Sequence, residues 1–279
     1  MNTSVKVTVL VDNEAPDELA KEHGFSTWIE TADLRILFDT GQLGALLTNA
    51  ERLRVPLDRA DALVLSHGHY DHTGMLPAFL KINDHARIYY CENLDISRYS
   101  CKPGTAPRSI GMPDASKAAL ASVSTGRIQE LGTPRYLTPK VGMTGPVPRF
   151  SLLEDTGGPF YLDDAGVKDD LIEDDQSMWF ETDKGLLILL GCCHAGLVNT
   201  VEYIKAISGI DRIHGILGGM HLVNADDTRL AYTFAHLNAW KPDFLLPCHC
   251  TGQSAVEKML DAIGNDIVIP GHAGLVIEA

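Results

Sequence analysis

A histidine-rich segment at residues 66–74 carries the side chains whose types and spacing best suit chemistry. It reads Ser-His-Gly-His-Tyr-Asp-His-Thr-Gly and follows a short apolar run. Along an extended chain, His67 and His69 point the same way, whereas the adjacent Asp71 and His72 diverge. Neutral imidazole and carboxylate groups are ligands of zinc, iron and manganese. One segment can therefore supply ligands to two neighbouring metal ions.

The alternative interpretation of this segment is a set of surface histidines on a polar turn. The chain has 11 histidines in 279 residues, and chance would give this pattern on the order of once in a thousand such chains. Two metal ions about 3.5 to 4 Å apart can clamp the attacking and leaving oxygens of a reacting bond. We therefore predict a dinuclear metal centre.

Three later histidines share one setting, after an apolar run and among small residues. His194 lies in Gly-Cys-Cys-His-Ala-Gly, His221 in Gly-Gly-Met-His-Leu and His249 in Pro-Cys-His-Cys-Thr-Gly. Enzymes built on sheets collect site residues at strand ends in this way, and we predict His194 as a third ligand of the first metal. His272, in a Pro-Gly turn, leaves the assignment of the last ligand ambiguous.

The elements that must position these residues alternate between strands and helices, as in an α/β fold. Strands are expected at residues 5–11, 25–31, 34–38, 62–65, 87–91, 177–182, 185–190, 213–217, 244–246, 267–269 and 275–277. Helices are expected at residues 43–53, 73–82, 197–207, 226–240 and 253–263.

Residues 92–175 differ from the rest of the chain. They hold eight of the 14 prolines and show weak periodicity, yet five aromatic residues exceed what a flexible spacer needs. We predict a single domain over residues 1–279 in which this range is an insertion that folds over the site as a lid. The run from Asp174 to Gln176 also stands out, with no role assigned.

Arg149, within this range, is the candidate for binding an anionic group of the substrate. Two nearby prolines stiffen its backbone, and a guanidinium suits anions. An ordinary surface arginine is the alternative interpretation. Lys102 and Arg108 are weaker candidates of the same kind.

Composition limits the partners and the compartment. The 37 acidic and 23 basic residues give a formal charge of -14, which disfavours nucleic acid and leaves a small-molecule substrate. No signal peptide is visible, and the longest apolar stretch is far shorter than the ~20 residues of a membrane span. The six cysteines suit reduced thiols. We expect a cytoplasmic protein without a membrane segment; the oligomeric state stays open.

The string His-x-His-x-Asp-His resembles the signature of the metallo-β-lactamase superfamily. The resemblance implies an αββα sandwich of two mixed sheets with outer helices and a metal site at one edge. It implies His67 and His69 on a first metal ion, and Asp71 and His72 on a second. It also implies that Asp39 orients the ligands from behind, where the residue type alone favours a turn.

The late histidine motifs and residues 144–149 are similar to a narrower group, the dihydropterin ribofuranosyl-aminobenzene phosphate synthase-like proteins of this superfamily. The similarity spans residues 25–265 and implies His194 and His249 as late ligands. Many superfamily hydrolases have a bridging aspartate where this chain has His221. Because each ring nitrogen offers one lone pair, we expect His221 to bind one metal terminally or to act as acid or base.

The leading functional hypothesis is a hydrolase that cleaves a phosphoester or related ester of a small, anionic molecule. Hydroxide bound by two divalent ions, zinc first and manganese or iron as alternatives, would attack the substrate. Asp71 would orient the nucleophile or take its proton, and His221 would stabilise or protonate the leaving oxygen.

Three alternatives to hydrolysis stay open. The subgroup implies a transferase that joins a pterin to a phosphorylated aminobenzene ribofuranoside. The others are an iron-dependent redox enzyme and a non-catalytic metal-binding protein. Cys248 and Cys250 flank His249 and would matter for redox chemistry, but we interpret them as core thiols that point away from the ligand.

Overall fold

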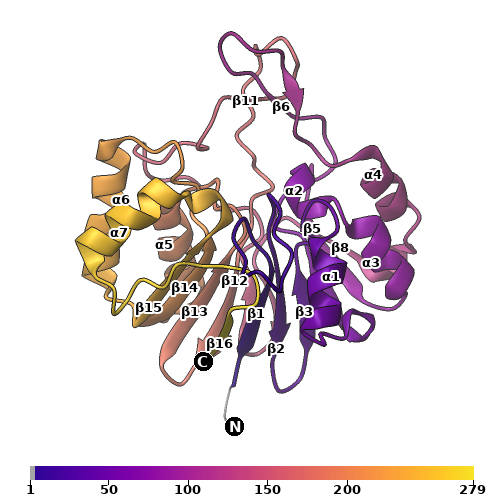
Figure 1. The fold of residues 1–279 in the computed structure, drawn as a ribbon, viewed down its shortest axis with the longest axis horizontal. Coiled ribbons are helices and arrows are strands. Elements are labelled where there is room, and N and C mark those ends of the chain that lie inside the picture. The colour runs from indigo at the N-terminus through magenta and orange to yellow at the C-terminus, as the bar shows by residue number, and fades with distance from the viewer. Residues whose placement is uncertain (1–3) are drawn as a thin grey trace.

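Two mixed β-sheets form the centre of the computed structural model, which describes residues 4–279 (Figure 1). Across this part of the chain, the first sheet consists, in spatial order, of Val276–Glu278 (β16), Lys6–Val11 (β1), Ser26–Glu30 (β2), Arg35–Phe38 (β3), Ala62–Val64 (β4), Arg87–Cys91 (β5) and Ile128–Leu131 (β8). The second consists of Phe244–Cys248 (β15), Ile213–Gly219 (β14), Gly185–Leu190 (β13), Met178–Thr182 (β12), Val141–Met143 (β10) and Arg135–Thr138 (β9).

The core between the sheets is built from alternate residues of the strands, because successive side chains of a strand point to opposite faces. Leu187 and Leu189 of β13 pack in the same apolar cluster as residues of the first sheet. Leu186, Ile188 and Leu190 of the same strand pack in a different cluster with the helices. Strand β13 is therefore buried on both faces, which explains its unbroken apolar sequence.

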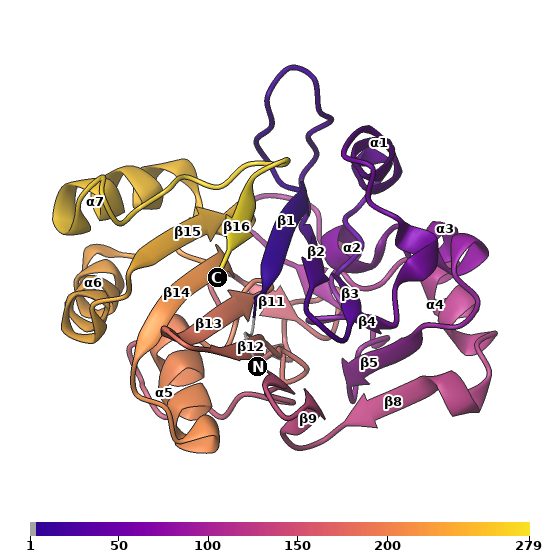
Figure 2. The ribbon, with the colours of Figure 1, turned by 90° about the horizontal axis from the view of Figure 1, so that it is seen from below.

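Helices cover the outer face of each sheet and complete an αββα sandwich (Figure 2). Those against the first sheet are Ala45–Arg52 (α1), Leu76–Ile82 (α3) and Asp114–Ala121 (α4). Those against the second sheet are Leu197–Ser208 (α5), Asp227–Trp240 (α6) and Gln253–Ile263 (α7). The predicted fold class is confirmed. Among the described residues, no helix is long and apolar enough to cross a membrane.

Residues 92–175, expected as one insertion, divide between the two sheets and a separate cover. Strands β8, β9 and β10 extend the sheets, and most side chains of β8 and β9 are not buried, so no alternation marked them as strands. Three two-residue strands form a small sheet above the strand ends (Figure 1). They are Phe160–Tyr161 (β11), Tyr99–Ser100 (β6) and Arg108–Ser109 (β7).

Two expected elements differ near their ends. The helix expected at residues 73–82 is split, because a short helix at Tyr70–Thr73 (α2) precedes α3 and begins inside the histidine-rich segment. The strand expected at residues 267–269 is reduced to an isolated bridge between Leu245 and Val268. Pro270 follows it and has no N–H to continue a ladder.

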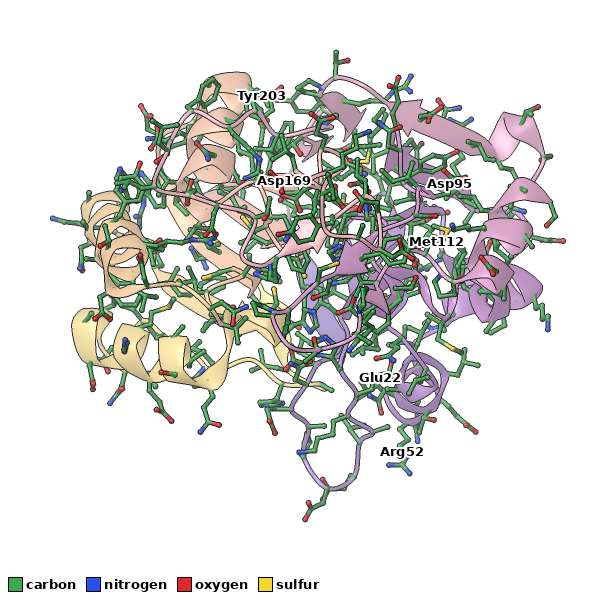
Figure 3. All side chains as sticks on the ribbon, turned by 90° about the horizontal axis from the view of Figure 1, so that it is seen from above. Glu22, Arg52, Asp95, Met112, Asp169 and Tyr203 are labelled. Atoms are coloured by element: carbon green, nitrogen blue, oxygen red, sulfur yellow. The ribbon has the colours of Figure 1, made fainter. Side chains whose placement is uncertain are left out.

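The loop between β1 and β2 is fixed to helix α1 by a carboxylate. Glu22 accepts hydrogen bonds from the backbone N–H groups of Gln42, Leu43 and Ala45. The last of these opens helix α1, where N–H groups have no partner within the helix. Figure 3 shows Glu22 beside this helix, seen from above. The anchored loop also carries His23 towards the strand ends.

Candidate metal centre

All seven predicted ligand residues come together at one edge of the sandwich, where strands of both sheets end. The histidine-rich segment follows β4, and His194, His221 and His249 follow β13, β14 and β15. The ring centroids of His194 and His221 lie 4.3 Å apart. Those of His72 and His249 lie 5.1 Å apart. The sandwich therefore brings ligand types from four distant stretches of sequence into one cluster.

His67, His69 and His194 form what we call the first ligand group. Their ring centroids lie 4.5 to 4.9 Å apart, all three residues are buried, and each Nε2 atom lacks a hydrogen-bond partner. Burial holds the pKa of each ring well below its ordinary value, so the rings are neutral near pH 7. Buried nitrogens with free lone pairs are costly when unpaired, and a divalent cation would satisfy them.

The Nδ1 atoms of His194 and His67 are tied to protein groups. Nδ1 of His194 lies 2.8 Å from the carbonyl oxygen of Thr156. A carbonyl can only accept, so Nδ1 carries the ring proton and Nε2 keeps its lone pair. Such partners behind a ring fix its tautomer and direction for metal binding.

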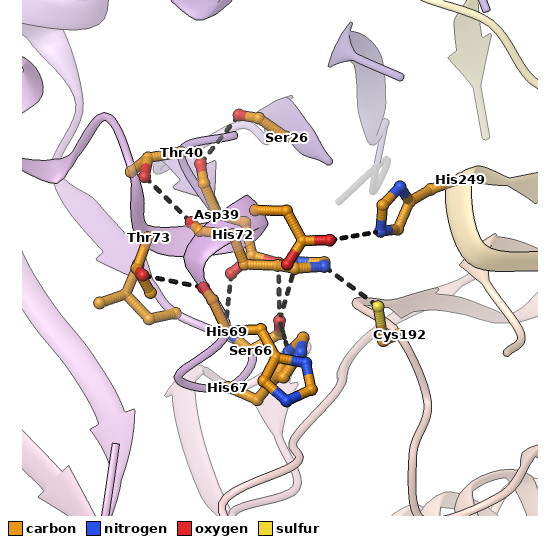
Figure 4. Close-up of polar contacts among 12 residues, drawn as sticks. Ser26, Asp39, Thr40, Ser66, His67, His69, His72, Thr73, Cys192 and His249 are labelled. Carbon is orange, nitrogen blue, oxygen red and sulfur yellow. Dashed lines mark hydrogen bonds and ion pairs between the residues drawn. The ribbon is translucent and has the colours of Figure 1, made fainter. Parts of the chain in front are cut away.

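Asp39 is the hub behind the histidine-rich segment (Figure 4). Its carboxylate accepts hydrogen bonds from the backbone N–H of Ser66 at 2.7 Å and from Ser66 Oγ at 2.6 Å, and lies 2.7 Å from His72 Nδ1. Since the Ser66 hydroxyl donates to Asp39, it accepts from His67 Nδ1 at 2.9 Å. One buried carboxylate thus orients His72 directly and His67 through a serine.

Asp71, His72 and His249 form the second ligand group. His249 Nε2 lies 3.4 Å from Asp71 Oδ2, and burial lowers the pKa of His249 to about 4. Burial also lowers the pKa of His72, but the Asp39 carboxylate outweighs it and the net pKa is raised. Asp71 and His72 lie on α2, where neighbouring side chains diverge by about 100°, so the divergence expected for extended chain arises from a helical turn.

His23 joins the second ligand group and was not found from the sequence. Its Nε2 lies 3.0 Å from Asp71 Oδ2, and its side chain is 54% exposed. Burial alone would raise the pKa of Asp71, but its contacts with His23 and His249 hold this pKa well below its ordinary value. No motif surrounds His23 in the sequence, so only the anchored loop reveals its place.

His221 lies beside the first ligand group with strained backbone. Its φ is +44°, a region that residues other than glycine rarely occupy. Its Nδ1 is buried without a partner, and a Cβ atom at Gly157 would lie 2.0 Å from it. Burial lowers the pKa of His221 to about 3. A ring that is neutral near pH 7 suits metal binding or proton acceptance better than protonation of a leaving oxygen.

The run Asp174 to Gln176 fastens the histidine-rich segment from the opposite side. Asp174 accepts a hydrogen bond from the backbone N–H of Gly68 at 2.8 Å and binds both terminal nitrogens of the buried Arg98 at 2.6 and 3.0 Å. Gln176 donates its backbone N–H to the Ser66 carbonyl at 2.9 Å. A bidentate charged pair of this kind holds its geometry well.

Arg149 holds the His194 loop and does not line the cavity. Its guanidinium donates to the carbonyl oxygens of Leu171 at 2.8 Å and His194 at 2.6 Å. Asp175 accepts a hydrogen bond from the backbone N–H of Ala195 at 2.9 Å in the same loop. The structure therefore gives Arg149 two backbone partners, and its binding of an anionic substrate group stays a prediction.

A cavity of about 470 Å³ opens beside the histidines and below the small sheet. It is lined by His69 of the first ligand group and by Asp71 and His249 of the second ligand group. Residues of the cover also line it, among them Lys102, Arg108 and Phe160. Figure 3 looks down on this end, where the loop that carries Asp169 crosses the molecule and forms a bridge with Tyr161. Lys102 and Arg108, the weaker candidates for binding an anion, therefore line the cavity, whereas Arg149 does not.

The flanking cysteines and His272 complete the comparison with the sequence. Cys248 packs in the core between the sheets, as expected, but Cys250 lines the cavity. The chain turns into a 3-10 helix at His249–Thr251 with φ of +46° at His249, so strand alternation fails there. His272 does not line this cavity; its Nδ1 lies 2.8 Å from the carbonyl oxygen of Ala273.

Comparisons with known proteins identify one matching family and two similar proteins of one organism. The model of the Metallo-beta-lactamase superfamily matches residues 21–196. An uncharacterized protein of Methanocaldococcus jannaschii is 34% identical over 97% of this chain and 99% of its own length. The 7,8-dihydropterin-6-methyl-4-(beta-D-ribofuranosyl)-aminobenzene-5'-phosphate synthase of the same organism is 30% identical over 92% of this chain and 90% of its own.

Solved structures show a similar fold. Tm1679, described as a metal-dependent hydrolase of the beta-lactamase superfamily, is 26% identical with a TM-score of 0.80, over 99% of both chains. A diphosphatase from the PhnP family is 14% identical with a TM-score of 0.52, over 99% of this chain and 98% of that one. The second similarity concerns the fold alone.

Proposed function

Because this chain belongs to the metallo-β-lactamase superfamily, we propose that it is a metal-dependent hydrolase that cleaves a phosphoester of a small, anionic molecule. The observation that carries the proposal is a set of buried, neutral histidines with unpaired nitrogens beside a cavity of about 470 Å³. The cationic side chains Lys102 and Arg108 line the same cavity. This arrangement would combine metal ligands with an anion-binding wall.

The residues fit two divalent ions, zinc first. The first ligand group would hold one ion, and the second ligand group, which contains a carboxylate, would hold the other. When bound, the ions supply Lewis-acid activation of water and of a phosphoryl oxygen. The unpaired Nε2 atoms of the first group and the ionised Asp71 are the fitting donors.

The substrate anion would bind to Arg108 and Lys102 in the wall of the cavity. The Arg108 guanidinium lies 4.7 Å from the ring centroid of Tyr70 and hydrogen-bonds its hydroxyl. This stacking directs a planar cation towards the cavity, and guanidinium matches the geometry of phosphate oxygens. In a chain with a formal charge of -14, these cations offset the field that would repel an anion.

Protons and leaving groups would be handled by the chain's own side chains. Asp71 stays ionised near neutral pH and would orient the attacking water. His23, which contacts Asp71 and is 54% exposed, would exchange protons with solvent. His221 would hydrogen-bond the leaving oxygen as a neutral ring. The small sheet β11-β6-β7 would act as a lid that excludes bulk water.

A transferase is the second candidate, and one observation favours it. The relative named as a synthase is 30% identical over 92% of this chain. The ring of Phe160 lines the cavity and offers a face on which a flat heterocycle could stack. Under this alternative the cations would bind the phosphate of one substrate while the other joins it.

The test combines metal content with product analysis. Protein purified without added metal is analysed for bound elements and then assayed on phosphomonoesters, phosphodiesters, diphosphates and lactones. We expect two ions per chain and turnover of a phosphoester without a second substrate. Turnover only when a pterin and a phosphorylated aminobenzene ribofuranoside are both present would overturn the hydrolase in favour of the transferase.

A further inference from the structure

Cys192 lies between the two ligand groups and takes no part in the proposed function. Its Sγ is 3.0 Å from His72 Nε2, an approach visible in Figure 4. It belongs to three sets of ligand atoms that lie within 4.8 Å of one another: with His67 and His194, with His72 and His249, and with His221 and Cys250. The sulfur therefore lies within 4.8 Å of ligand atoms of both groups, and Cys192 lines the cavity.

The surroundings of Cys192 differ from those of a core thiol. Cys193, the next residue, packs in the apolar cluster beneath helix α5, and its Sγ lies 3.3 Å from Thr200 Oγ1. Cys248 packs between the sheets. Across the described chain, Cys192 belongs to none of the three apolar clusters, although it is 2% exposed. Its neighbours are imidazoles and the thiol of Cys250.

The contact with His72 shows what the thiol does without metal. His72 Nδ1 donates a hydrogen bond to the Asp39 carboxylate at 2.7 Å. His72 Nε2 and the Cys192 sulfur share a hydrogen bond on the other side of the ring. A proton thus lies where a cation would be bound by both nitrogen and sulfur. Metal binding would replace this proton, as it does at other cysteine ligands.

The chain also lacks the carboxylate expected to join two ions, since His221 stands in its place. A ring nitrogen has a single lone pair and cannot bind two metals, whereas a thiolate sulfur has several. We propose that Cys192 is a metal ligand that bridges the two ions as a thiolate. The proposal rests on the dinuclear site of the proposed function and adds a soft ligand to it.

The exchange balances in atoms and electrons. The S–H bond of Cys192 breaks, its electron pair stays on sulfur and is donated to the metals, and the proton leaves to the buffer. No oxidant or reductant takes part. Soft thiolate ligands favour zinc or iron over magnesium and manganese, so the bridge would also set the metal preference.

The test is the absorption spectrum of the cobalt(II) protein, prepared from full-length, metal-free chain under reducing conditions. Thiolate ligation gives an intense sulfur-to-cobalt charge-transfer band in the near ultraviolet. We expect this band in the wild type, its loss in Cys192→Ser, and its retention in Cys193→Ser and Cys250→Ser. Zinc affinity should fall at least ~10-fold in Cys192→Ser.

X-ray absorption of the zinc-loaded wild type provides a second test that needs no variant. A sulfur neighbour at about 2.3 Å from zinc would support the proposal, and a shell of nitrogen and oxygen alone would overturn it. Persistence of the cobalt band in Cys192→Ser would also overturn it. Hydrolysis without sulfur ligation would contradict the thiolate bridge but not the proposed function. Sulfur ligation without hydrolysis would contradict the proposed function but not the thiolate ligand.

Discussion

The two ligand groups differ in how many of their polar atoms have protein partners when no metal is bound. In the first ligand group, each Nε2 is buried and lacks a protein partner. In the second, His72 Nε2 has the Cys192 thiol at 3.0 Å, and Asp71 contacts both His23 and His249. His249 Nε2 of the second group also lacks a hydrogen-bond partner. The first group is thus unsatisfied at all three rings without a cation, while the second is satisfied in part.

This difference implies an order of binding. A cation at the first ligand group binds nitrogens that have no other partner. A cation at the second must displace the proton between His72 and Cys192 and the contacts of Asp71 with His23 and His249. The first ion should bind more tightly, and the second should respond more to pH and to neighbouring side chains. Four variants test this difference between the groups, and a fifth, at Arg108, tests the cavity wall beside them.

The largest effect is expected for His194→Ala. Loss of a ligand from the first group should release the tighter ion and lower kcat/KM for the phosphoester by at least ~1000-fold, about 4 kcal/mol of transition-state stabilisation. Steady-state kinetics and metal analysis measure both effects. His272→Ala, at a histidine outside the cavity, is the matched control and should leave kcat/KM unchanged. Activity of His194→Ala within tenfold of wild type would contradict the contrast.

Asp39→Asn should weaken metal binding unequally. Asp39 contacts His72 directly but reaches His67 only through Ser66, so affinity at the second site should fall by about 10- to 100-fold and at the first by less. Calorimetric titration of metal-free protein resolves the two steps. Asp33→Asn removes an exposed carboxylate in the turn after β2 and should change neither. An equal loss at both sites would refute the difference between the groups.

Arg108→Ala tests the anion-binding wall. Removing this cation should raise KM for a phosphorylated substrate about 10-fold with little change in kcat or metal content, because a charged hydrogen bond of this type contributes about 1.5 to 3 kcal/mol. Arg149→Ala should instead lower the melting temperature, since its partners are backbone carbonyls. A higher KM in Arg149→Ala alone would return the substrate role to that residue.

His249→Gln tests the acid sensitivity of the second group. The folded pKa of His249, about 4, lies below its ordinary value of 6.5, so between these values the unfolded chain binds a proton that the folded chain does not. Stability is therefore lost as pH falls through this window, by up to about 1.4 kcal/mol per unit. Denaturation of metal-free protein from pH 6.5 to 4.5 should show a steeper fall in wild type than in the variant.

Burial raises the pKa of Asp175 to about 7, which changes stability in the opposite sense. Since Asp175 is present in both proteins, the difference between their slopes isolates His249. Equal slopes would show that His249 is not held neutral by the fold.

Local rules identified the candidate metal ligands that the structure brings together, whereas long-range contacts decided how the other residues are placed. His67 and His69 follow from spacing along one strand end, and the long apolar run of β13 locates His194. Arg149 was assigned to the substrate because the stiffness of its backbone is local information, but its acceptors at Leu171 and His194 are not.

Cys250 shows a second limit of local rules. Alternation predicted that it points away from the site, but alternation holds only in extended chain, and positive φ at His249 turns the thiol into the cavity. The roles of Asp174 and Gln176 were likewise invisible, because their partners in the histidine-rich segment lie about a hundred residues earlier. Sequence patterns identify residue types that can bind metal; contacts between distant loops decide how they are held.

The smallest effect is expected for His23→Gln, the one residue of the second group's surroundings with a largely exposed side chain. An ion pair at such exposure contributes at most about 1 kcal/mol, so affinity for the second ion should change by less than about fivefold and affinity for the first not at all. The same titration of metal-free protein measures both, with His85→Gln as a control at an exposed histidine beside Asp84. A change at the first site would mean that the two groups are coupled through Asp71, and the ordered binding inferred from their different partners would fail.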